Sequence, residues 1–302
     1  MLDLPFATRY IDTGHARLEC LTAGEGQERV AILLHGFPEA HFSWRHQIGF
    51  LAGRGYEVWA PNQRGYGGST RPQAVAAYHV DHLCADVAGL IDQVAAGRPV
   101  TLMAHDWGAL VAWVFAIRRL RPLERLVVMN VPHPARLPEE FRRPGSDQQK
   151  RSWYVFLFQL PGLPELGLTA GRAGAVGRAF SGMAIDKSRF PPEVLDAYRA
   201  QALLPGAARA MVNWYRANFR GNAFAPYRRE VVAPITVPTL MVWGEEDSAL
   251  HLNLTTGYEG LVDDFTLVRL PGVSHWVQQE APEAVNAALA GWLDRPPLLP
   301  SA

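Results

Sequence analysis

The sequence predicts an α/β fold, a mostly parallel, doubly wound sheet with an inserted helical lid. Short apolar runs typical of buried strands alternate with longer segments of helical periodicity, and this alternation is typical of parallel sheets built from βαβ units. The alternation stops near residue 135 and resumes near residue 233. We therefore expect core residues 1–134 and 233–302 to enclose a helical cap or lid at 135–232.

The first part of the core contains the clearest strand. Residues 100–104 read Val-Thr-Leu-Met-Ala, an apolar run interrupted only by Thr101, which predicts a central strand buried on both faces. The other expected strands are 16–22, 30–34, 57–60 and 126–129, and the expected helices are 42–52, 80–94 and 109–120.

The expected lid has no buried strand. Its aromatic segments of helical pattern are punctuated by prolines. Its glycine-rich stretch from Gly162 to Gly182 is expected to be loop or a mobile part of the lid. The helices expected in the lid are 153–160, 194–203 and 208–219; the second core part should contain strands 239–243 and 265–270 and a helix at 283–293.

The composition of the chain limits the kinds of macromolecule or membrane with which it is expected to interact. Lys+Arg and Asp+Glu both number 29, so neither nucleic acid nor an anionic membrane is expected as a partner. No run of 18 uncharged apolar residues occurs, so no membrane span is expected. The first residues lack the basic and apolar regions of a signal peptide, and we expect a cytoplasmic monomer or homodimer.

The cysteines and histidines give no sign of a disulfide or a metal site. Cys20 and Cys84 lie in apolar-periodic segments, which favours two buried free thiols. His79 and His82 are three residues apart on a predicted helix, but no third ligand accompanies them. We expect neither a metal nor a cofactor.

A candidate nucleophile follows the central strand. In Ala104-His105-Asp106-Trp107-Gly108, small residues lie two positions before and after Asp106. A tight strand-to-helix turn that exposes a nucleophile requires this pattern, although serine is usual at its centre. The alternative is that Asp106 only caps the following helix, because aspartate is a common N-cap.

A second motif follows the strand expected at 30–34. His35-Gly36-Phe37-Pro38 lies where the fold supplies a backbone N–H to an oxyanion hole. The expected pair of donors is the amides of Phe37 and Trp107.

The remaining members of a catalytic triad follow two later strands. Asp247 comes after the strand at 239–243, and His275 after the strand at 265–270. The order nucleophile, acid, histidine is that of hydrolases with this topology. Glu245 and Glu246 are alternatives to Asp247, whereas Asn130, at another strand end, is uncharged and a poorer candidate for the acid.

These motifs together resemble the α/β-hydrolase-fold epoxide hydrolases of the soluble type. The similarity extends from about Thr8 to Trp292, except between Leu163 and Arg189. Its core motifs are His35-Gly36-Phe37-Pro38-Glu39, Ser43-Trp44-Arg45-His46-Gln47-Ile48, Arg64-Gly65-Tyr66-Gly67 and His105-Asp106-Trp107-Gly108.

Two segments of the expected lid sharpen the resemblance. The stretches around Tyr154 and Tyr215 resemble those that carry the two ring-opening tyrosines of the family. A phenol, with a pKa of about 10, can protonate an alkoxide that is nearly as basic as hydroxide. The alternative is that Tyr154 and Tyr215 only pack against other aromatic residues of the lid. Tyr198 is an alternative proton donor.

The resemblance implies a covalent mechanism. Asp106 would open the epoxide as nucleophile, and His275, oriented by Asp247, would activate the water that hydrolyses the ester to a vicinal diol. The expected substrate is a small apolar or aromatic epoxide. The residues expected to line its pocket are His35, Pro38, His105, Trp153, Phe158, Trp214 and Trp276.

Three other functions remain as alternatives. A haloalkane or haloacid dehalogenase would use the same aspartate, but the side chain of Phe37 cannot donate to a halide, and Trp107 replaces the arginine usual in fluoroacetate dehalogenases. Asp106 in place of serine argues against an ester or carbon–carbon hydrolase. A non-catalytic binding protein would have no need for the complete set of catalytic residues.

Overall fold

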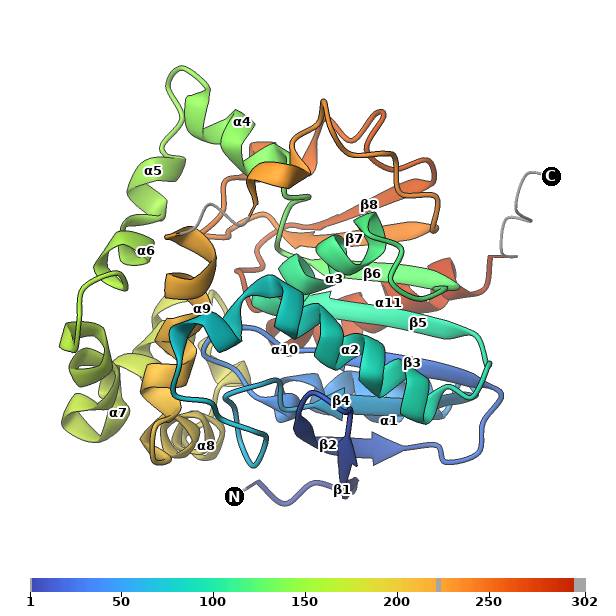
Figure 1. Cartoon of the computed structure of the whole chain (residues 1–302), viewed down its shortest axis with the longest axis horizontal. Coiled ribbons are helices and arrows are strands. Elements are labelled where there is room, and N and C mark those ends of the chain that lie inside the picture. Colours follow the sequence, from blue (N-terminus) through green and yellow to red (C-terminus); the bar gives the residue numbers. More distant parts are fainter. Residues whose placement is uncertain (1, 221–223, 296–302) are drawn as a thin grey trace.

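The structure is a computed structural model that describes residues 2–220 and 224–295. Residue 1, residues 221–223 of the expected lid and residues 296–302 of the second core part lie outside the described residues. Its sheet has the order β1-β2-β4-β3-β5-β6-β7-β8 (Figure 1). The strands are β1 (Ala7–Asp12), β2 (Arg17–Ala23), β3 (Arg29–Leu34), β4 (Tyr56–Pro61), β5 (Val100–His105), β6 (Arg125–Met129), β7 (Thr239–Gly244) and β8 (Phe265–Leu270).

The sheet is mostly parallel, as predicted. β1 and β2 pair antiparallel, β2 pairs antiparallel with β4, and the pairs from β4 to β8 are parallel. The edge strand β1 was not predicted from the sequence, because nearly all its side chains are exposed and leave no apolar pattern.

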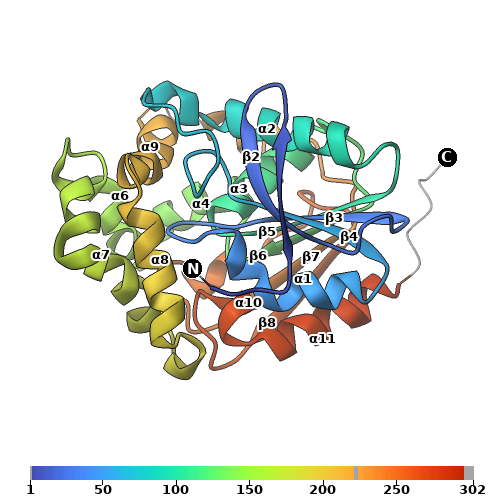
Figure 2. The same ribbon diagram turned by 90° about the horizontal axis from the view of Figure 1, so that it is seen from below.

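Helices cover both faces of the sheet. Figure 2 shows α2 and α3 on one side of the strands and α1, α10 and α11 on the other. These helices are α1 (Arg45–Ala52), α2 (Val80–Val94), α3 (Trp107–Ile117), α10 (Val277–Glu280) and α11 (Pro282–Leu293). Because both faces are covered, β5, between β3 and β6, is buried along its whole length, which confirms the prediction for residues 100–104.

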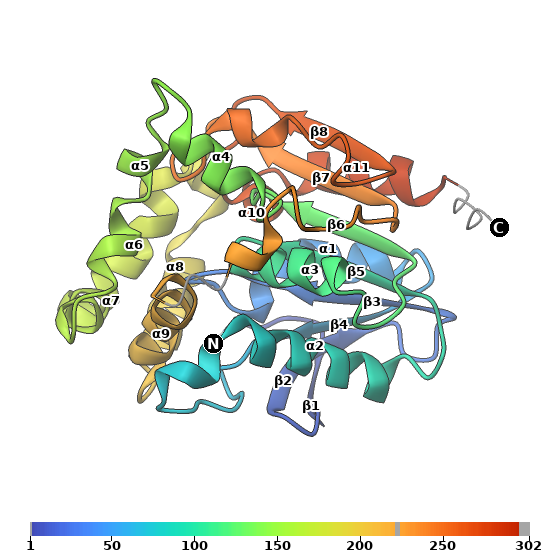
Figure 3. The ribbon, with the colours of Figure 1, turned by 45° about the horizontal axis from the view of Figure 1, so that its top comes forward.

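A helical insertion separates β6 from β7. Figures 1 and 3 place its helices together beyond one end of the sheet. They are α4 (Arg136–Arg142), α5 (Gln148–Arg151), α6 (Trp153–Leu157), α7 (Leu163–Met183), α8 (Pro192–Leu203) and α9 (Ala207–Phe219). The short helices α4 and α5 were not predicted, because neither is long enough to show a clear apolar period.

The prediction of a loop between Gly162 and Gly182 was wrong. Residues Leu163–Met183 form α7, which consists of two helical segments joined by a kink at Ala170 to Ala173. Each glycine disfavours helix by about 1 kcal/mol relative to alanine, but tertiary packing outweighs that preference. Phe180 of α7 is fully buried and stacks on Tyr198 of α8, with ring centroids 4.0 Å apart.

Helix α9 is tied to the core by polar contacts. The indole N–H of Trp214 donates to the carbonyl of Arg64 at 3.0 Å. Asn218 accepts from the amide of Val80 at 2.8 Å and donates to the carbonyl of Tyr78 at 2.9 Å. The insertion is therefore anchored at the start of α2, and α9 lies in a defined position over the sheet.

Two expectations from composition concern cysteines and membrane spans. Cys20 and Cys84 are free and buried, as predicted. Across residues 2–220 and 224–295, none of the helices combines the length and apolar character that crossing a bilayer demands.

Candidate active site

Asp106 occupies a strained turn between β5 and α3. Its backbone has φ 48° and ψ −124°, a conformation that side-chain-bearing residues rarely adopt. A Cβ at Gly108 would lie 2.4 Å from the Leu34 carbonyl oxygen, and one at Gly36 would lie 2.3 Å from the Asp106 Cβ. Glycine at both positions therefore allows the turn to pack against the end of β3.

The carboxylate of Asp106 does not cap α3. It accepts no capping hydrogen bond from the described first turn of that helix. Its Oδ1 instead accepts from the amide of Phe37 at 2.6 Å. Trp107, the other expected oxyanion donor, is the first residue of α3, so its amide belongs to the N-terminal turn that has no intrahelical acceptor.

His275 lies between two carboxylates. Its Nδ1 is 2.7 Å from Asp247 Oδ2, and its Nε2 is 3.5 Å from Asp106 Oδ2. Asp247 is buried and held by the amides of Ala249 and Leu250 at 2.7 and 3.0 Å. The rival carboxylate of Glu246 is exposed to solvent. The structure thus brings the three predicted residues together in the order of a triad.

The two carboxylates set the charge of the imidazole. Burial disfavours its charged form, but Asp247 and Asp106 outweigh this effect and raise the pKa of His275 to about 10. Burial likewise raises the pKa of Asp106, yet its bond and attraction to His275, together with His105 and the Phe37 amide, leave that pKa below its usual value. The site without substrate is therefore an imidazolium beside an ionised Asp106.

Asn130 is a member of the site that the sequence interpretation set aside. It follows β6 with φ 46°, and its side-chain N–H donates to Asp247 Oδ2 at 2.7 Å. Its Oδ1 accepts from the amide of Gly244 at 3.0 Å. Asparagine tolerates this left-handed backbone better than most residues, so Asn130 connects the end of β6 to the acid after β7.

A buried pair of residues, Glu39 and His105, lies behind the nucleophile. His105 Nδ1 is 2.7 Å from Glu39 Oε2, and its Nε2 is 2.9 Å from the carbonyl oxygen of His275. Glu39 also accepts from the amide of Gly36 and from the side chains of Gln278 and Gln279.

The surroundings of this pair are complementary. The carboxylate of Glu39 faces only hydrogen-bond donors, and both ring nitrogens of His105 lie against acceptor oxygens. Burial raises the pKa of Glu39, but the attraction of His105 outweighs burial and lowers it. Glu39 and His105 both belong to motifs recognised in the sequence, but the spacing of these motifs did not indicate that the two side chains are in contact.

Glu280 holds the loop that carries His275. Its Oε2 accepts from the amide of Ser274 at 3.1 Å and from the Ser274 hydroxyl. Its Oε1 accepts from the amides of Ile185 and Asp186, both at 2.8 Å. One buried carboxylate therefore joins the His275 loop to the insertion, a role that no sequence signal suggested.

A cavity of about 480 Å³ lies above Asp106, between the core and the insertion. Asp106, Tyr154 and Tyr215 all line it. Burial, followed by the charge of Asp106, raises the pKa of Tyr154 above its usual value. Burial also raises the pKa of Tyr215, with Tyr154 and Asp106 adding to it.

Tyr198, the alternative donor, has another role. Its hydroxyl donates to Gln279 at 2.7 Å, its ring is fully buried, and it does not line this cavity. The two tyrosines proposed from the sequence are therefore the ones beside Asp106.

The cavity has a different lining from the one expected from the sequence. None of the predicted set lines the cavity: His35, Pro38, His105, Trp153, Phe158, Trp214 and Trp276. Six of them are buried in the scaffold and Trp153 is 62% exposed. Burial lowers the pKa of His35 to about 4, which leaves it neutral, and its Nε2 accepts from the amide of Gln63 at 3.1 Å.

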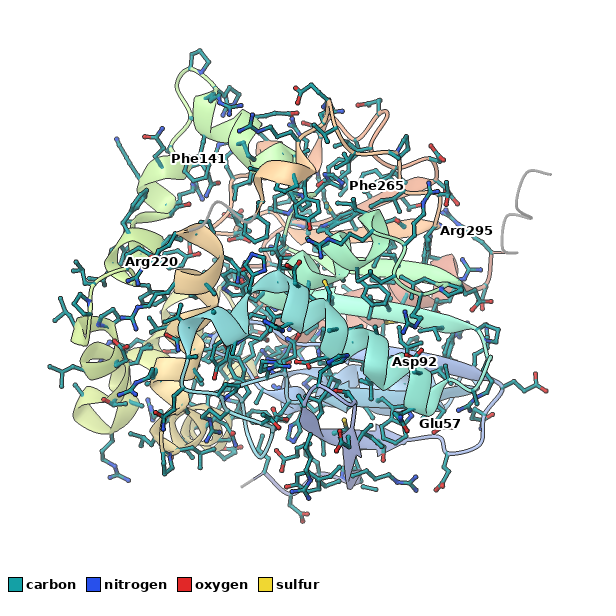
Figure 4. The ribbon with its side chains drawn as sticks, viewed as in Figure 1. Glu57, Asp92, Phe141, Arg220, Phe265 and Arg295 are labelled. Atoms are coloured by element: carbon teal, nitrogen blue, oxygen red, sulfur yellow. The ribbon has the colours of Figure 1, made fainter. Side chains whose placement is uncertain are left out.

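The walls of the cavity are formed mostly by apolar residues. Figure 4 shows Phe141 on α4 and Arg220 just after α9, both on the side of the molecule where the insertion lies. Besides Phe141 and Arg220, the lining residues include Leu110, Val131, Leu137, Val155, Phe156, Phe219, Phe224 and Leu250.

The chain is similar to known epoxide hydrolases over nearly its whole length. Residues 30–282 match the α/β-hydrolase fold family. Epoxide hydrolase A of Mycobacterium tuberculosis is 35% identical over 317 residues, covering 94% of this chain and 96% of that protein. Mouse epoxide hydrolase 4 is 34% identical over 292 residues, which cover 94% of this chain and 78% of that protein.

A comparison with solved structures also finds similarity to an epoxide hydrolase. An epoxide hydrolase from Bacillus megaterium, crystallised with an inhibitor, superposes with a TM-score of 0.85 at 26% identity. The superposition covers 95% of this chain and 100% of that one. The order of the strands and the helical insertion are thus those of a fold whose solved members include epoxide hydrolases.

Proposed function

The chain belongs to the epoxide hydrolases of the α/β-hydrolase fold, and we propose the residues through which it converts an epoxide to a vicinal diol. The reaction passes through an ester between the substrate and an aspartate. One observation carries the assignment of residues: Asp106, 3.5 Å from His275, shares its cavity with Tyr154 and Tyr215.

The first step is alkylation of Asp106. A carboxylate oxygen attacks an epoxide carbon, a carbon–oxygen bond of the ring breaks, and its electron pair moves to the ring oxygen. Tyr154 and Tyr215 stabilise that oxygen and protonate it. Their raised pKa values keep both phenols protonated at neutral pH, so the donors are present when the ring opens.

Ester formation changes the charge beside His275. Asp106 loses its negative charge when it is alkylated, so one of the two carboxylates that raise the pKa of His275 no longer acts. The pKa of the imidazole therefore falls, and its proton replaces the one that the tyrosines gave up. Before the ester forms, protonated His275 is the counter-ion of Asp106. After the ester has formed, neutral His275 can act as a base.

The second step is hydrolysis of that ester. Neutral His275, oriented by Asp247, takes a proton from water, and the hydroxide attacks the carbonyl carbon of the ester. The amides of Phe37 and Trp107 stabilise the tetrahedral oxyanion. Its collapse breaks the bond between the carbonyl carbon and the substrate oxygen, and that oxygen takes the proton of the added hydroxyl group. The diol leaves, and ionised Asp106 remains beside an imidazolium, the state from which the cycle began.

The substrate class follows from the walls of the cavity. Apart from Asp106 and the two phenols, the lining is dominated by aliphatic and phenyl groups, which favours an apolar or aromatic epoxide. The insertion at 135–232 acts as the lid, since Tyr154, Phe156 and Phe219 all reach the cavity from its helices.

A dehalogenase is not favoured. Halide leaves without a proton and would need N–H donors rather than phenols, and the side chain at Phe37 offers no donor. The solved structure and the relatives described above all bear epoxide hydrolase names.

The function is tested with a panel of epoxides and haloalkanes of matched size. The wild type should form diol from apolar and aromatic epoxides, and Asp106→Asn, which keeps the side-chain size but is not an anionic nucleophile, should not. Halide release from haloalkanes that exceeds diol formation from every epoxide would contradict the proposal.

A further inference from the structure

The exposed apolar side chains of this protein are concentrated on the helical insertion. Of the ten large hydrophobic residues exposed in the described part of the chain, eight lie between Trp153 and Leu204. Five of them lie on α6, in the turn that follows it and at the start of α7, and each is between 46% and 66% exposed. This outer apolar patch consists of Trp153, Phe156, Leu160, Leu163 and Leu166.

The patch lies on a positively charged part of a neutral chain. Residues 148–220 contain ten Lys and Arg but four Asp and Glu, whereas the whole chain has 29 of each. The remainder of the chain therefore has an excess of six acidic residues. Lys150, three positions before Trp153, and Arg209 are both exposed, and neither forms an ion pair with a described residue.

A second cavity connects these charges to the patch. It has a volume of about 520 Å³ and lies between α7, the end of α8 and α9. Arg209, Arg216 and Arg220 line it together with Leu166 of the patch, while Glu165 supplies the single carboxylate and pairs with Arg216. Arg209, which has no ion-pair partner among the described residues, thus lies in the same cavity as exposed Leu166.

The patch also borders the cavity of the active site. Phe156 belongs to the patch and lines that cavity, and Arg220 lines both cavities. Figures 1, 2 and 3 agree in placing α6 and α7 at the outer limit of the molecule, on the side of the insertion. A flat partner resting on the patch would therefore lie next to the cavity that Asp106 lines.

We propose that the outer apolar patch docks on the surface of an anionic lipid bilayer. Apolar side chains enter the interface while lysine and arginine meet lipid phosphates. An apolar epoxide partitions into the same bilayer because of the hydrophobic effect. Docking in this orientation sets the apolar active-site cavity beside the phase that holds such a substrate.

The charges favour a bilayer over a second copy of the chain. A symmetric dimer formed through the patch would place the same basic segments against each other, whereas anionic lipid complements them. Net charge calculated for the whole sequence indicates no attraction to a membrane, because the acidic remainder cancels the basic segment. A net charge summed over the whole sequence does not show that basic residues are concentrated in 148–220 and acidic residues in the remainder.

Vesicle flotation with the full chain tests this proposal without turnover, so its result does not depend on epoxide hydrolysis. The probes are vesicles of phosphatidylcholine alone and of phosphatidylcholine mixed equally with phosphatidylglycerol. Wild type should float with the mixed vesicles, bind phosphatidylcholine at least about tenfold more weakly, and lose binding as ionic strength rises.

Two pairs of matched variants separate the apolar and charged contributions. Leu163→Ser/Leu166→Ser should weaken binding to the mixed vesicles by about tenfold or more; Val231→Ser, at an apolar residue 70% exposed away from the patch, should not. Arg209→Glu should weaken binding by at least about fivefold, given the usual contribution of one basic residue near anionic lipid. Arg228→Glu, another exposed arginine, should have little effect. Unchanged thermal unfolding confirms that each variant is folded.

Three results would overturn the proposal. The first is no flotation of the wild type with the mixed vesicles at low ionic strength. The second is equal binding to both vesicle types. The third is a dimer of the free wild type that Leu163→Ser/Leu166→Ser converts to monomer in light scattering, since the patch would then be an interface between copies of the chain.

Discussion

Asn130 and His275 donate to the same oxygen of Asp247, each over 2.7 Å. One donor follows β6 and the other follows β8, so the acid after β7 is held from both sides. A carboxylate that accepts two such bonds has little freedom to rotate away from the imidazole. We therefore assign Asn130 a positioning role in the hydrolytic step.

Removal of Asn130 should affect one half-reaction more than the other. Asn130→Ala removes a hydrogen bond to a buried carboxylate, which typically contributes about 1–3 kcal/mol. Ester hydrolysis should slow by roughly tenfold while alkylation changes little, as measured in single-turnover kinetics. Asn62→Ala, at another buried asparagine, which bonds to Glu19 and the His41 amide, is the control. Equal slowing of both steps in Asn130→Ala would mean a general structural role.

The ester intermediate should be visible by isotope and by mass. A single turnover in heavy-oxygen water should yield unlabelled diol and a label in Asp106, because the diol oxygen comes from the carboxylate. His275→Gln should accumulate enzyme heavier by one substrate in intact-protein mass spectrometry. Label in the diol during the first turnover would instead mean direct attack by water.

The two phenols should act in ring opening alone. Tyr154→Phe and Tyr215→Phe should each slow alkylation of Asp106, and the double variant should lose nearly all of it. Hydrolysis of an ester formed beforehand should be less affected, since His275 performs that step. Tyr198→Phe is the matched control, because its hydroxyl bonds to Gln279 outside the cavity. Full epoxide turnover in the double variant would rule out this role.

The turn at Asp106 should not tolerate a methyl group. In Gly108→Ala the new Cβ would meet the Leu34 and His35 carbonyl oxygens at 2.4 and 2.6 Å. Both are backbone atoms, so the strand or the turn must move, and we expect loss of activity with a destabilisation of about 1–3 kcal/mol. Gly167→Ala, in α7 with no atom within 4 Å of the added carbon, should instead stabilise by about 0.5–1 kcal/mol. Urea unfolding and diol formation distinguish the two.

The charge of His275 should make stability depend on pH. Its pKa is about 10 in the folded chain against an ordinary value of 6.5, so the folded state holds the proton more tightly. The resulting stabilisation is complete below pH 6.5 and is lost as pH rises toward 10. The free energy of unfolding of the wild type should therefore fall relative to that of His275→Gln between pH 7 and 10. A constant difference over that range would show that the pKa is not raised.

The local pattern of apolar residues along the sequence was enough to predict most strands and helices of the fold. It also predicted the order of the triad residues along the chain. A strand buried on both faces is apolar throughout, as at β5, and parallel strands end at one edge of the sheet. Residues that follow β5, β7 and β8 were therefore expected to meet, and Asp106, Asp247 and His275 do. Tyr154 and Tyr215 were recognised by family resemblance, because aromatic spacing alone does not distinguish a proton donor from a packing residue.

Tertiary structure decided the partners of those residues and the walls of the cavity. Glu39 meets His105 across 66 positions, and Asn130 meets Asp247 across 117. Such contacts depend on how the strands and the insertion pack, which no local period encodes. The same packing buried Trp214 and Trp276 instead of exposing them to the cavity, and it made α7 helical despite its glycines. The sequence by itself determined which chemical groups the site contains, while the fold determined what each group faces and hence its charge.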